Sequence, residues 1–301
     1  MSNNNTDLYP NLKLEDIIKI LEKKDSERLN NAVYSADGVD VVCDLSYIND
    51  RDFYHNFDIY YGKPKNEGRP TVIMVHGGGL VYGTKELNKQ VGIYLVKFGF
   101  NVVNINYRLL PFVTLKEQFM DVCDAFSYIY ENSFSLNLNS KNICVVSDSA
   151  GSFLTLAAYA LMKNKNFRRI FNLSAKNVDI SAMAFISPMT HLLESGSLSL
   201  INEPARFGLN DEEKSFTDNV LKAFENINLP PSIVVTSKED FIRAQAKSLK
   251  IFLEGRDTKN IFLDFRKTDG YPLGHEFAVS HPDLSESKVV LNEISNFFNN
   301  F

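Results

Sequence analysis

An apolar run that stops at a serine between small residues constrains the fold of this chain more than any other feature. Residues 142–146 are rich in β-branched and other apolar side chains, as in a buried strand. Over residues 152–162, apolar side chains recur at helical spacing instead. Ser149 therefore lies at a strand-to-helix turn, where a strained backbone would expose its hydroxyl and the helix N-terminus would supply free N–H groups. The pattern predicts a nucleophilic serine.

The residues beside Ser149 fit such a turn at all but one position. The turn is usually written Gly-x-Ser-x-Gly, whereas this chain has Ser147, Asp148, Ser149, Ala150 and Gly151. Ser147 thus occupies the position of the first glycine. Because the serine side chain is small, we still expect the turn to form.

From residue 69 onward, strand-like and helical segments alternate, which predicts an α/β fold with a mostly parallel sheet and helices on both faces. The expected strands are 71–75, 101–106, 142–146, 178–186, 232–236 and 261–265, and the expected helices are 85–98, 115–131, 152–162, 243–253 and 284–298. Two earlier segments, 38–48 and 53–61, predict an antiparallel hairpin at the sheet edge.

Two regions fall outside this alternation. A helix with one apolar face is expected near the N-terminus, ending near Lys24, and it could either pack at the edge of the core or cover the mouth of a site. Residues 187–229 carry no strand signal and are too long for a plain connection, which predicts an inserted helical cap.

Composition argues against several classes of partner. The 301-residue chain has a net charge of -5 and dispersed basic residues, so nucleic acid is not an expected partner. Neither a membrane span nor export is expected, because no run of about eighteen apolar residues and no leader pattern is visible. Cys43, Cys123 and Cys144 each adjoin aliphatic residues and predict buried free thiols in a reducing, cytoplasmic setting.

A serine hydroxyl needs a base to take its proton and a third group to hold that base. His275 lies in a glycine- and proline-containing loop after the last expected strand, from which it could reach Ser149. Glu239 and Asp240 both follow the strand 232–236. Asp240 is the stronger candidate because its shorter side chain holds an imidazole more rigidly, although it could also cap the next helix. The order Ser149, Asp240, His275 is that of α/β-hydrolases.

A second signal is the sequence His76, Gly77, Gly78 and Gly79, directly after an expected strand. Consecutive glycines let backbone N–H groups approach a ligand with no Cβ in the way. Such donors stabilise the oxyanion of acyl transfer by about 3–4 kcal/mol each. We expect Gly78, Gly79 and Ala150 to be the oxyanion donors, and His76 and Gly77 to shape the loop.

These motifs resemble those of the hormone-sensitive-lipase-like branch of the α/β-hydrolases. The glycine loop matches that family's His-Gly-Gly-Gly motif, residues 147–151 resemble its Gly-Asp-Ser-Ala-Gly turn, and residues 107–111 resemble its Tyr-Arg-Leu-Ala-Pro segment. The resemblance covers roughly residues 72–277. It implies serine-dependent carboxylester hydrolysis without a metal or cofactor. In that family an N-terminal segment and an insertion form the cap, which here implies residues 1–37 and about 187–229, with the catalytic domain over 38–301.

The chain departs from the family pattern at three positions. Ser147 replaces glycine, Leu110 replaces alanine, and Glu276 follows the histidine where glycine is common. A carboxylate at Glu276 could raise the pKa of His275 or bind a polar group of the substrate. Both possibilities stay open at the level of sequence.

The expected function is hydrolysis of small, short-chain acyl esters through an acyl-enzyme. An amidase or formamidase and a deacetylase of acetylated carbohydrates would use the same machinery and stay open as alternatives. A non-catalytic small-molecule binding protein on a hydrolase scaffold is the alternative from another class. The expected partner is a small-molecule ester, and the oligomeric state stays open, with a homodimer as one option.

Overall fold

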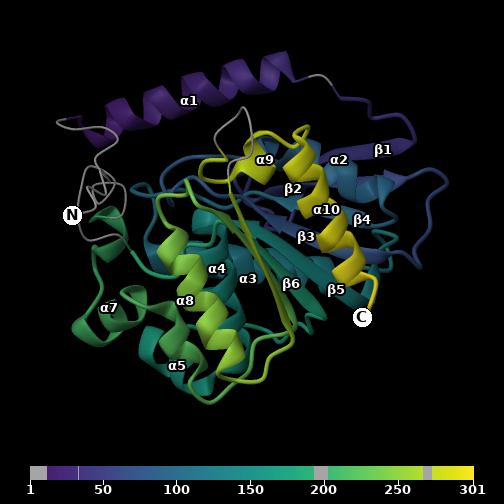
Figure 1. Cartoon of the computed structure of the whole chain (residues 1–301). Helices are drawn as coiled ribbons and strands as arrows, with labels where there is room; N and C mark the ends of the chain where they lie inside the picture. Colours follow the sequence, from purple (N-terminus) through teal and green to yellow (C-terminus); the bar gives the residue numbers. More distant parts are fainter. Residues whose placement is uncertain (1–11, 33, 193–202, 267–272) are drawn as a thin grey trace.

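The computed structural model describes residues 12–32, 34–192, 203–266 and 273–301. Its centre is one eight-stranded sheet in the order β1-β2-β4-β3-β5-β6-β7-β8 (Figure 1). The strands are Val39–Ser46 (β1), Asn56–Gly62 (β2), Pro70–Val75 (β3), Asn101–Ile105 (β4), Asn139–Asp148 (β5), Ala182–Ile186 (β6), Ser232–Ser237 (β7) and Asn260–Phe265 (β8). β2 pairs antiparallel with β1 and β4, and all other neighbours are parallel. The mostly parallel sheet and the edge hairpin predicted from the sequence are confirmed.

Helices cover both faces of this sheet (Figure 1). The α-helices are Leu14–Asn31 (α1), Lys89–Lys97 (α2), Leu115–Glu131 (α3), Ser149–Lys163 (α4), Lys165–Phe171 (α5), Asp211–Thr217 (α7), Arg243–Glu254 (α8), Phe277–Ser280 (α9) and Ser285–Phe298 (α10). α3, α4 and α8 contribute to one apolar core, whereas α2, α9 and α10 contribute to the core on the other face. Burial on both faces explains why the central strands are apolar almost throughout.

Helix α3 shows how local sequence fixes an element. The Thr114 hydroxyl accepts a hydrogen bond from the Glu117 N–H (3.3 Å), and the Glu117 carboxylate accepts one from the Thr114 N–H (2.7 Å). This reciprocal capping box satisfies two backbone donors that a helix start leaves unpaired. The helix then buries one face against α4 and the sheet.

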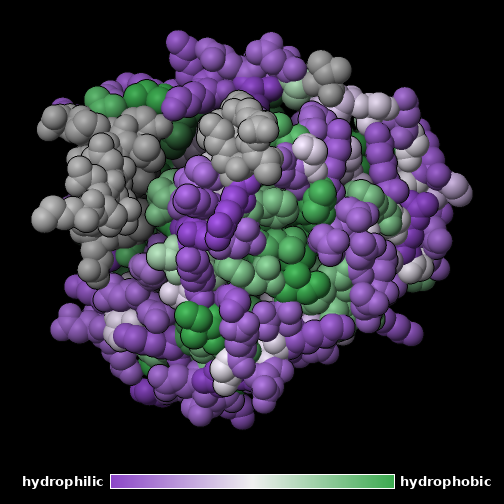
Figure 2. All heavy atoms as spheres, in the orientation of Figure 1, coloured by the Kyte–Doolittle hydropathy of each residue, from purple (hydrophilic) through white to green (hydrophobic). Residues whose placement is uncertain are grey.

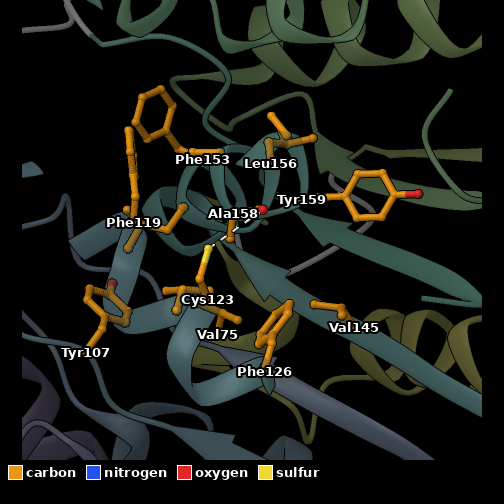
Figure 3. Close-up of a cluster of buried hydrophobic side chains, with 14 of the residues drawn as sticks. Val75, Tyr107, Phe119, Cys123, Phe126, Val145, Phe153, Leu156, Ala158 and Tyr159 are labelled. Carbon is orange, nitrogen blue, oxygen red and sulfur yellow. Dashed lines mark hydrogen bonds between the residues drawn. The ribbon is translucent and has the colours of Figure 1, made fainter. Parts of the chain in front are cut away.

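Figure 3 shows the interior that this face forms. Phe119 of α3 lies beside Phe153 of α4 with the two rings 6.0 Å apart, and Cys123 points toward Ala158 of the same helix, whereas Phe126 lies on the side of Val75 and Val145. Each of these side chains is fully or almost fully buried. Because α4 begins at Ser149, this packing also fixes where that serine lies.

The segment 187–229 contains helical turns at Glu203–Arg206, Asp211–Thr217 and Val220–Phe224 in its described part, and residues 193–202 lie outside the described residues.

Helix α1 runs to Asn31, past the predicted end near Lys24, and only Ile17 of it is fully buried. The Tyr82 hydroxyl donates a hydrogen bond to the Asp25 carboxylate (2.7 Å), which ties α1 to the segment after the glycine loop. A groove of about 930 Å³ lies between them.

One prediction about the cysteines is wrong. Cys123 and Cys144 are buried, as expected, but Cys43 is exposed. Cys43 lies on β1, which is the edge strand and pairs on one side only, and the β1–β2 register shifts between Val42 and Leu45. An aliphatic neighbourhood in sequence therefore did not imply burial, because alternate residues of an edge strand face solvent.

The opposite sheet edge, β8, is only half-buried along its whole length. Figure 2 shows hydrophobic residues gathered on this face between α8 and α10, where β8 lies. On β8, the side chains that pack against the core beneath are Ile261, Leu263 and Phe265.

Within the described ranges, none of the helices is long and apolar enough to cross a bilayer.

The interior described above predicts a large cost for truncating Phe126. We expect Phe126→Ala to lower the free energy of unfolding by about 3–5 kcal/mol, because it removes a fully buried ring and leaves a cavity. Phe134→Ala is the matched control, since that ring is 89% exposed just after the same helix, and its effect should stay within about 0.5 kcal/mol. Urea unfolding followed by circular dichroism measures both values, and equal effects would contradict this account of the core.

Candidate active site

The turn around Ser149 has the strained geometry that the sequence predicts. β5 ends at Asp148, α4 begins at Ser149, and Ser149 has a positive φ of 44°. A non-glycine residue is uncommon in this left-handed region, and strained residues of this kind cluster at functional sites. A Cβ on Gly151 would lie 2.3 Å from the Val75 carbonyl oxygen and 2.4 Å from the His76 carbonyl oxygen, so only glycine fits there.

Ser147 does not meet the same constraint. It lies within β5 and pairs with Val75 on one side and Phe185 on the other, so its backbone is ordinary strand. Its buried hydroxyl donates a hydrogen bond to the Ser152 hydroxyl (3.3 Å). The first glycine of the motif is therefore not required by backbone conformation in this chain.

The structure brings together the three residues that the sequence proposes as nucleophile, base and acid. His275 Nε2 lies 2.9 Å from Ser149 Oγ, and His275 Nδ1 lies 2.8 Å from Asp240 Oδ1. Ser149 and Asp240 follow the carboxyl ends of β5 and β7, and His275 follows β8. Because these strands are parallel, their carboxyl ends share one edge of the sheet, which is where α/β proteins bind ligands.

Further contacts hold the acid and the base. Asp240 Oδ2 accepts a hydrogen bond from the Thr236 hydroxyl (3.0 Å), and Oδ1 accepts one from the Ile242 N–H (3.0 Å). The Phe241 ring packs against the His275 ring at 4.4 Å between centroids. Asp240 is thus fixed by its own turn and can hold one orientation of the imidazole.

Burial and charge act in opposite directions on this pair. Burial alone would lower the pKa of His275, but the charges of Asp240 and Glu276 outweigh it and raise that pKa to about 9. Burial alone would raise the pKa of Asp240, but the His275 charge and hydrogen bond bring that pKa below its usual value. The site therefore stabilises an imidazolium ion, the form that a base reaches when it takes a proton from serine.

The glycine loop after β3 adopts backbone conformations that favour glycine. Gly78 has a φ of 108° and Gly79 a φ of 63°, and a Cβ on Gly78 would lie 2.0 Å from the Tyr82 carbonyl oxygen. Among the described residues, neither the Gly78 nor the Gly79 N–H donates a hydrogen bond. The Ala150 N–H belongs to the first turn of α4, where helical N–H groups have no partner within the helix.

His76 is buried within this loop. Its Nδ1 lies 2.8 Å from the Gly77 carbonyl oxygen, and its ring stacks on Tyr107 at 4.3 Å between centroids. The Tyr107 hydroxyl donates to the His76 carbonyl oxygen (2.8 Å). Burial lowers the pKa of His76 to about 4, so its ring is neutral near neutral pH.

The segment that resembles Tyr-Arg-Leu-Ala-Pro anchors the structure around the loop. Arg108 Nε and Nη2 donate to the two carboxylate oxygens of Asp121 at 2.9 and 2.6 Å, and the Arg108 N–H donates there as well (3.0 Å). A bidentate pair of this kind fixes both partners in orientation. Tyr107 is thereby held against the glycine loop.

Asp148 is a structural residue that the sequence argument missed. Its Oδ2 accepts the Gly77 N–H (2.7 Å) and its Oδ1 accepts the Asn88 amide (2.7 Å), while the side chain is buried. Asp148 thus ties the serine turn to the glycine loop. Its place directly before Ser149 was the available signal, but nothing in the sequence indicated Asn88, which lies 60 residues away along the chain.

The part of the His275 loop at residues 267–272, which includes Tyr271 and Pro272, lies outside the described residues. Glu276 has a positive φ of 55°, which gives a backbone reason why glycine is common at this position in the family that the sequence resembles. Its Oε1 lies 3.6 Å from His275 Nε2. Glu239, the alternative acid, is exposed, whereas Asp240 makes the contact with His275.

Comparisons with known proteins identify the family of this chain. A family model described as BD-FAE matches residues 57–251. A protein of Acanthamoeba polyphaga mimivirus that carries the name of an alpha/beta hydrolase is 23% identical over 283 residues, which cover 88% of this chain and 79% of the relative. An acetyl esterase of Salmonella paratyphi B is 26% identical over 106 residues, 35% of this chain and 33% of that protein.

Solved structures show the same fold over nearly the whole chain. Esterase B from Lactobacillus rhamnosis superposes with a TM-score of 0.87 at 22% identity, covering 95% of this chain and 93% of that one. An esterase from the archaeon Pyrobaculum calidifontis superposes with a TM-score of 0.72 at 21% identity, covering 98% and 94%. At these identities the likeness concerns the fold. Together with the family model, which matches more than half of its length, it establishes that the chain is an α/β-hydrolase that belongs to the BD-FAE family.

Proposed function

We propose that this protein is a serine carboxylic ester hydrolase that acts on small, short-chain acyl esters. The observation that carries the proposal is the hydrogen-bonded series from Ser149 Oγ through His275 to Asp240, with distances of 2.9 and 2.8 Å. Nucleophile, base and orienting acid are within direct reach of one another, which is the geometry that nucleophilic catalysis requires.

In the proposed reaction, His275 Nε2 takes the proton of Ser149 as its oxygen attacks the ester carbonyl. The resulting oxyanion accepts hydrogen bonds from the Gly78, Gly79 and Ala150 N–H groups, and Asp240 stabilises the imidazolium ion. Collapse of the tetrahedral intermediate breaks the ester C–O bond, and His275 returns the proton to the leaving alcohol. Water, activated in the same way, then releases the acid from the acyl-enzyme.

The names of related proteins support a short acyl group. The matched Salmonella protein is an acetyl esterase, and esterase B from Lactobacillus rhamnosis has been solved with a tributyrin phosphonate inhibitor. Both concern esters of small acids. We extend this chemistry to the present chain as a proposal about its substrate class.

The Ser149→Ala variant tests the nucleophile. Hydrolysis of p-nitrophenyl acetate should fall by about 10⁴-fold or more, because the acyl-enzyme can no longer form. Ser147→Gly is the matched control in the same turn and should retain activity, since the Ser147 backbone is ordinary strand. Undiminished hydrolysis by Ser149→Ala would overturn the assignment of Ser149 as the nucleophile. A wild-type protein whose Ser149 resists a fluorophosphonate probe would favour a binding protein instead.

The base predicts an alkaline pH dependence. A base must be neutral to accept a proton, and the pKa of His275 is raised to about 9. We therefore expect kcat/KM for an uncharged ester to rise with pH through about that value. Asp240→Asn should move this rise to lower pH, because it removes a charge that stabilises the imidazolium ion, and should lower kcat by about 10⁴-fold. A wild-type plateau already reached at mildly acidic pH would contradict the assignment.

A chain-length series tests the substrate class. We expect kcat/KM to be highest for acetate and butyrate among p-nitrophenyl esters and to fall for long acyl chains. The panel should include anilides, a formamide and acetylated sugars, and the Ser149→Ala variant as the blank. Faster turnover of any of these than of simple esters would move the assignment to an amidase, a formamidase or a carbohydrate deacetylase.

A further inference from the structure

Glu276 occupies a backbone conformation that disfavours its own side chain. Its φ of 55° lies in the left-handed region, where residues other than glycine, asparagine and aspartate are uncommon. The Glu276 N–H donates to the Ser187 hydroxyl (3.0 Å), and its carbonyl oxygen accepts from Val279 and Ser280 at 2.9 and 2.8 Å. These hydrogen bonds hold the backbone on both sides of Glu276, so it cannot relax out of the left-handed conformation without breaking them. Such strain at a site suggests that the side chain has a task.

The carboxylate of Glu276 turns into the site. Its Oε1 is buried and has no ordinary donor as a partner among the described residues. A Cβ on Gly77 would lie 2.4 Å from Glu276 Oε1 and 2.5 Å from Asp148 Oδ2. The two carboxyl groups therefore converge on the open space beside Gly77 where a Cβ would stand, and the Ser149 Cβ lies 3.1 Å from the same position.

Two ionised carboxylates are unfavourable at such a point. Each is an acceptor only, so neither can donate to the other, and their like charges repel in a buried setting. Asp148 already accepts hydrogen bonds from Gly77 and Asn88 and is 2% exposed. A single proton removes both problems, because it supplies a donor and halves the charge.

We propose that Asp148 and Glu276 share one proton and act as a singly charged pair that joins the His275 loop to the glycine loop. Both are positioning residues that act through His275 and Gly77, and their effect on catalysis rests on the proposed function. Burial, together with the Glu276 charge, raises the pKa of Asp148 well above its usual range, which is the direction that a shared proton requires.

The groups around the pair are consistent with one retained charge. Asp240, Glu276 and Asp148 are the acidic groups that act on His275. The Tyr107 hydroxyl, whose pKa is raised by burial and by the charges of Asp148 and Glu276, stays protonated. His76 is neutral near neutral pH. The pair therefore adds one negative charge beside the base, enough to stabilise an imidazolium ion without a second buried charge.

A double-mutant cycle on the pH dependence tests the shared proton. With one charge in the wild type, Asp148→Asn leaves Glu276 ionised and should barely move the acidic limb of kcat/KM. Glu276→Gln leaves the charge on the more distant Asp148 and should lower the pKa of the acidic limb moderately. The double variant removes all charge from the pair and should lower this pKa by roughly one unit or more, which exceeds the sum of the two single shifts. Equal and additive single shifts would mean two independent charges and would overturn the proposal.

Infrared difference spectroscopy tests the same proton without any activity. The wild-type spectrum minus that of Glu276→Gln should contain the C=O stretch of a protonated carboxylic acid, shifted in heavy water. The wild-type spectrum minus that of Asp148→Asn should contain the same band. If Asp148→Asn does not fold, the comparison with Glu276→Gln is sufficient for the test. Absence of the band overturns the shared proton even in an active esterase, whereas its presence in a protein without esterase activity would overturn only the proposed function.

Discussion

The backbone ladder between β3, β5 and β6 is the constraint on which the rest of the site depends. Val75 pairs with Ser147, and Asp148 pairs with Ile186, so three parallel strands end within a residue or two of one another. The glycine loop leaves from one of these ends, the serine turn from the next and the 187–229 segment from the third. A shift of one residue in this register would turn Asp148 away from Gly77 and separate Ser149 from the proposed oxyanion donors.

Much of the fold followed from sequence because each central strand is buried on both faces. Such strands are continuous apolar runs, and segments 71–75 and 232–236 were located to within a residue. Burial at the edge strands was harder to predict, because an apolar segment beside solvent and one in the interior can have the same composition. Cys43 on β1 is the example, where neighbours in sequence gave the wrong exposure. Short helices such as α5 and α9 were not predicted, because they have too few turns to show a helical repeat of apolar residues.

The residues of the candidate site also fall into those that the sequence could predict and those that it could not. The proximity of Ser149, Asp240 and His275 was predictable because each follows a strand that the sequence reveals, and the proposed roles come from their order along the chain. Asn88 was not predictable, since it lies at the start of α2 and reaches Asp148 only through folding. The position of Glu276 was visible as a departure, but its backbone conformation and its approach to Gly77 were not, because both depend on the folded chain. Local pattern thus identifies groups that chemistry needs, and tertiary contacts identify the groups that hold them.

The distance along the chain between Ser149 and His275 has a consequence for synthesis. These two residues are 126 positions apart, and the base comes from the last strand-to-helix connection of the sheet. Contacts of such long range form late, because the intervening chain must first be ordered. During translation Ser149 emerges well before His275, so under the proposed mechanism its hydroxyl stays unactivated until the C-terminal part has docked. The proposed mechanism therefore implies that an incomplete chain lacks the reactive serine and that reactivity appears only with the finished fold.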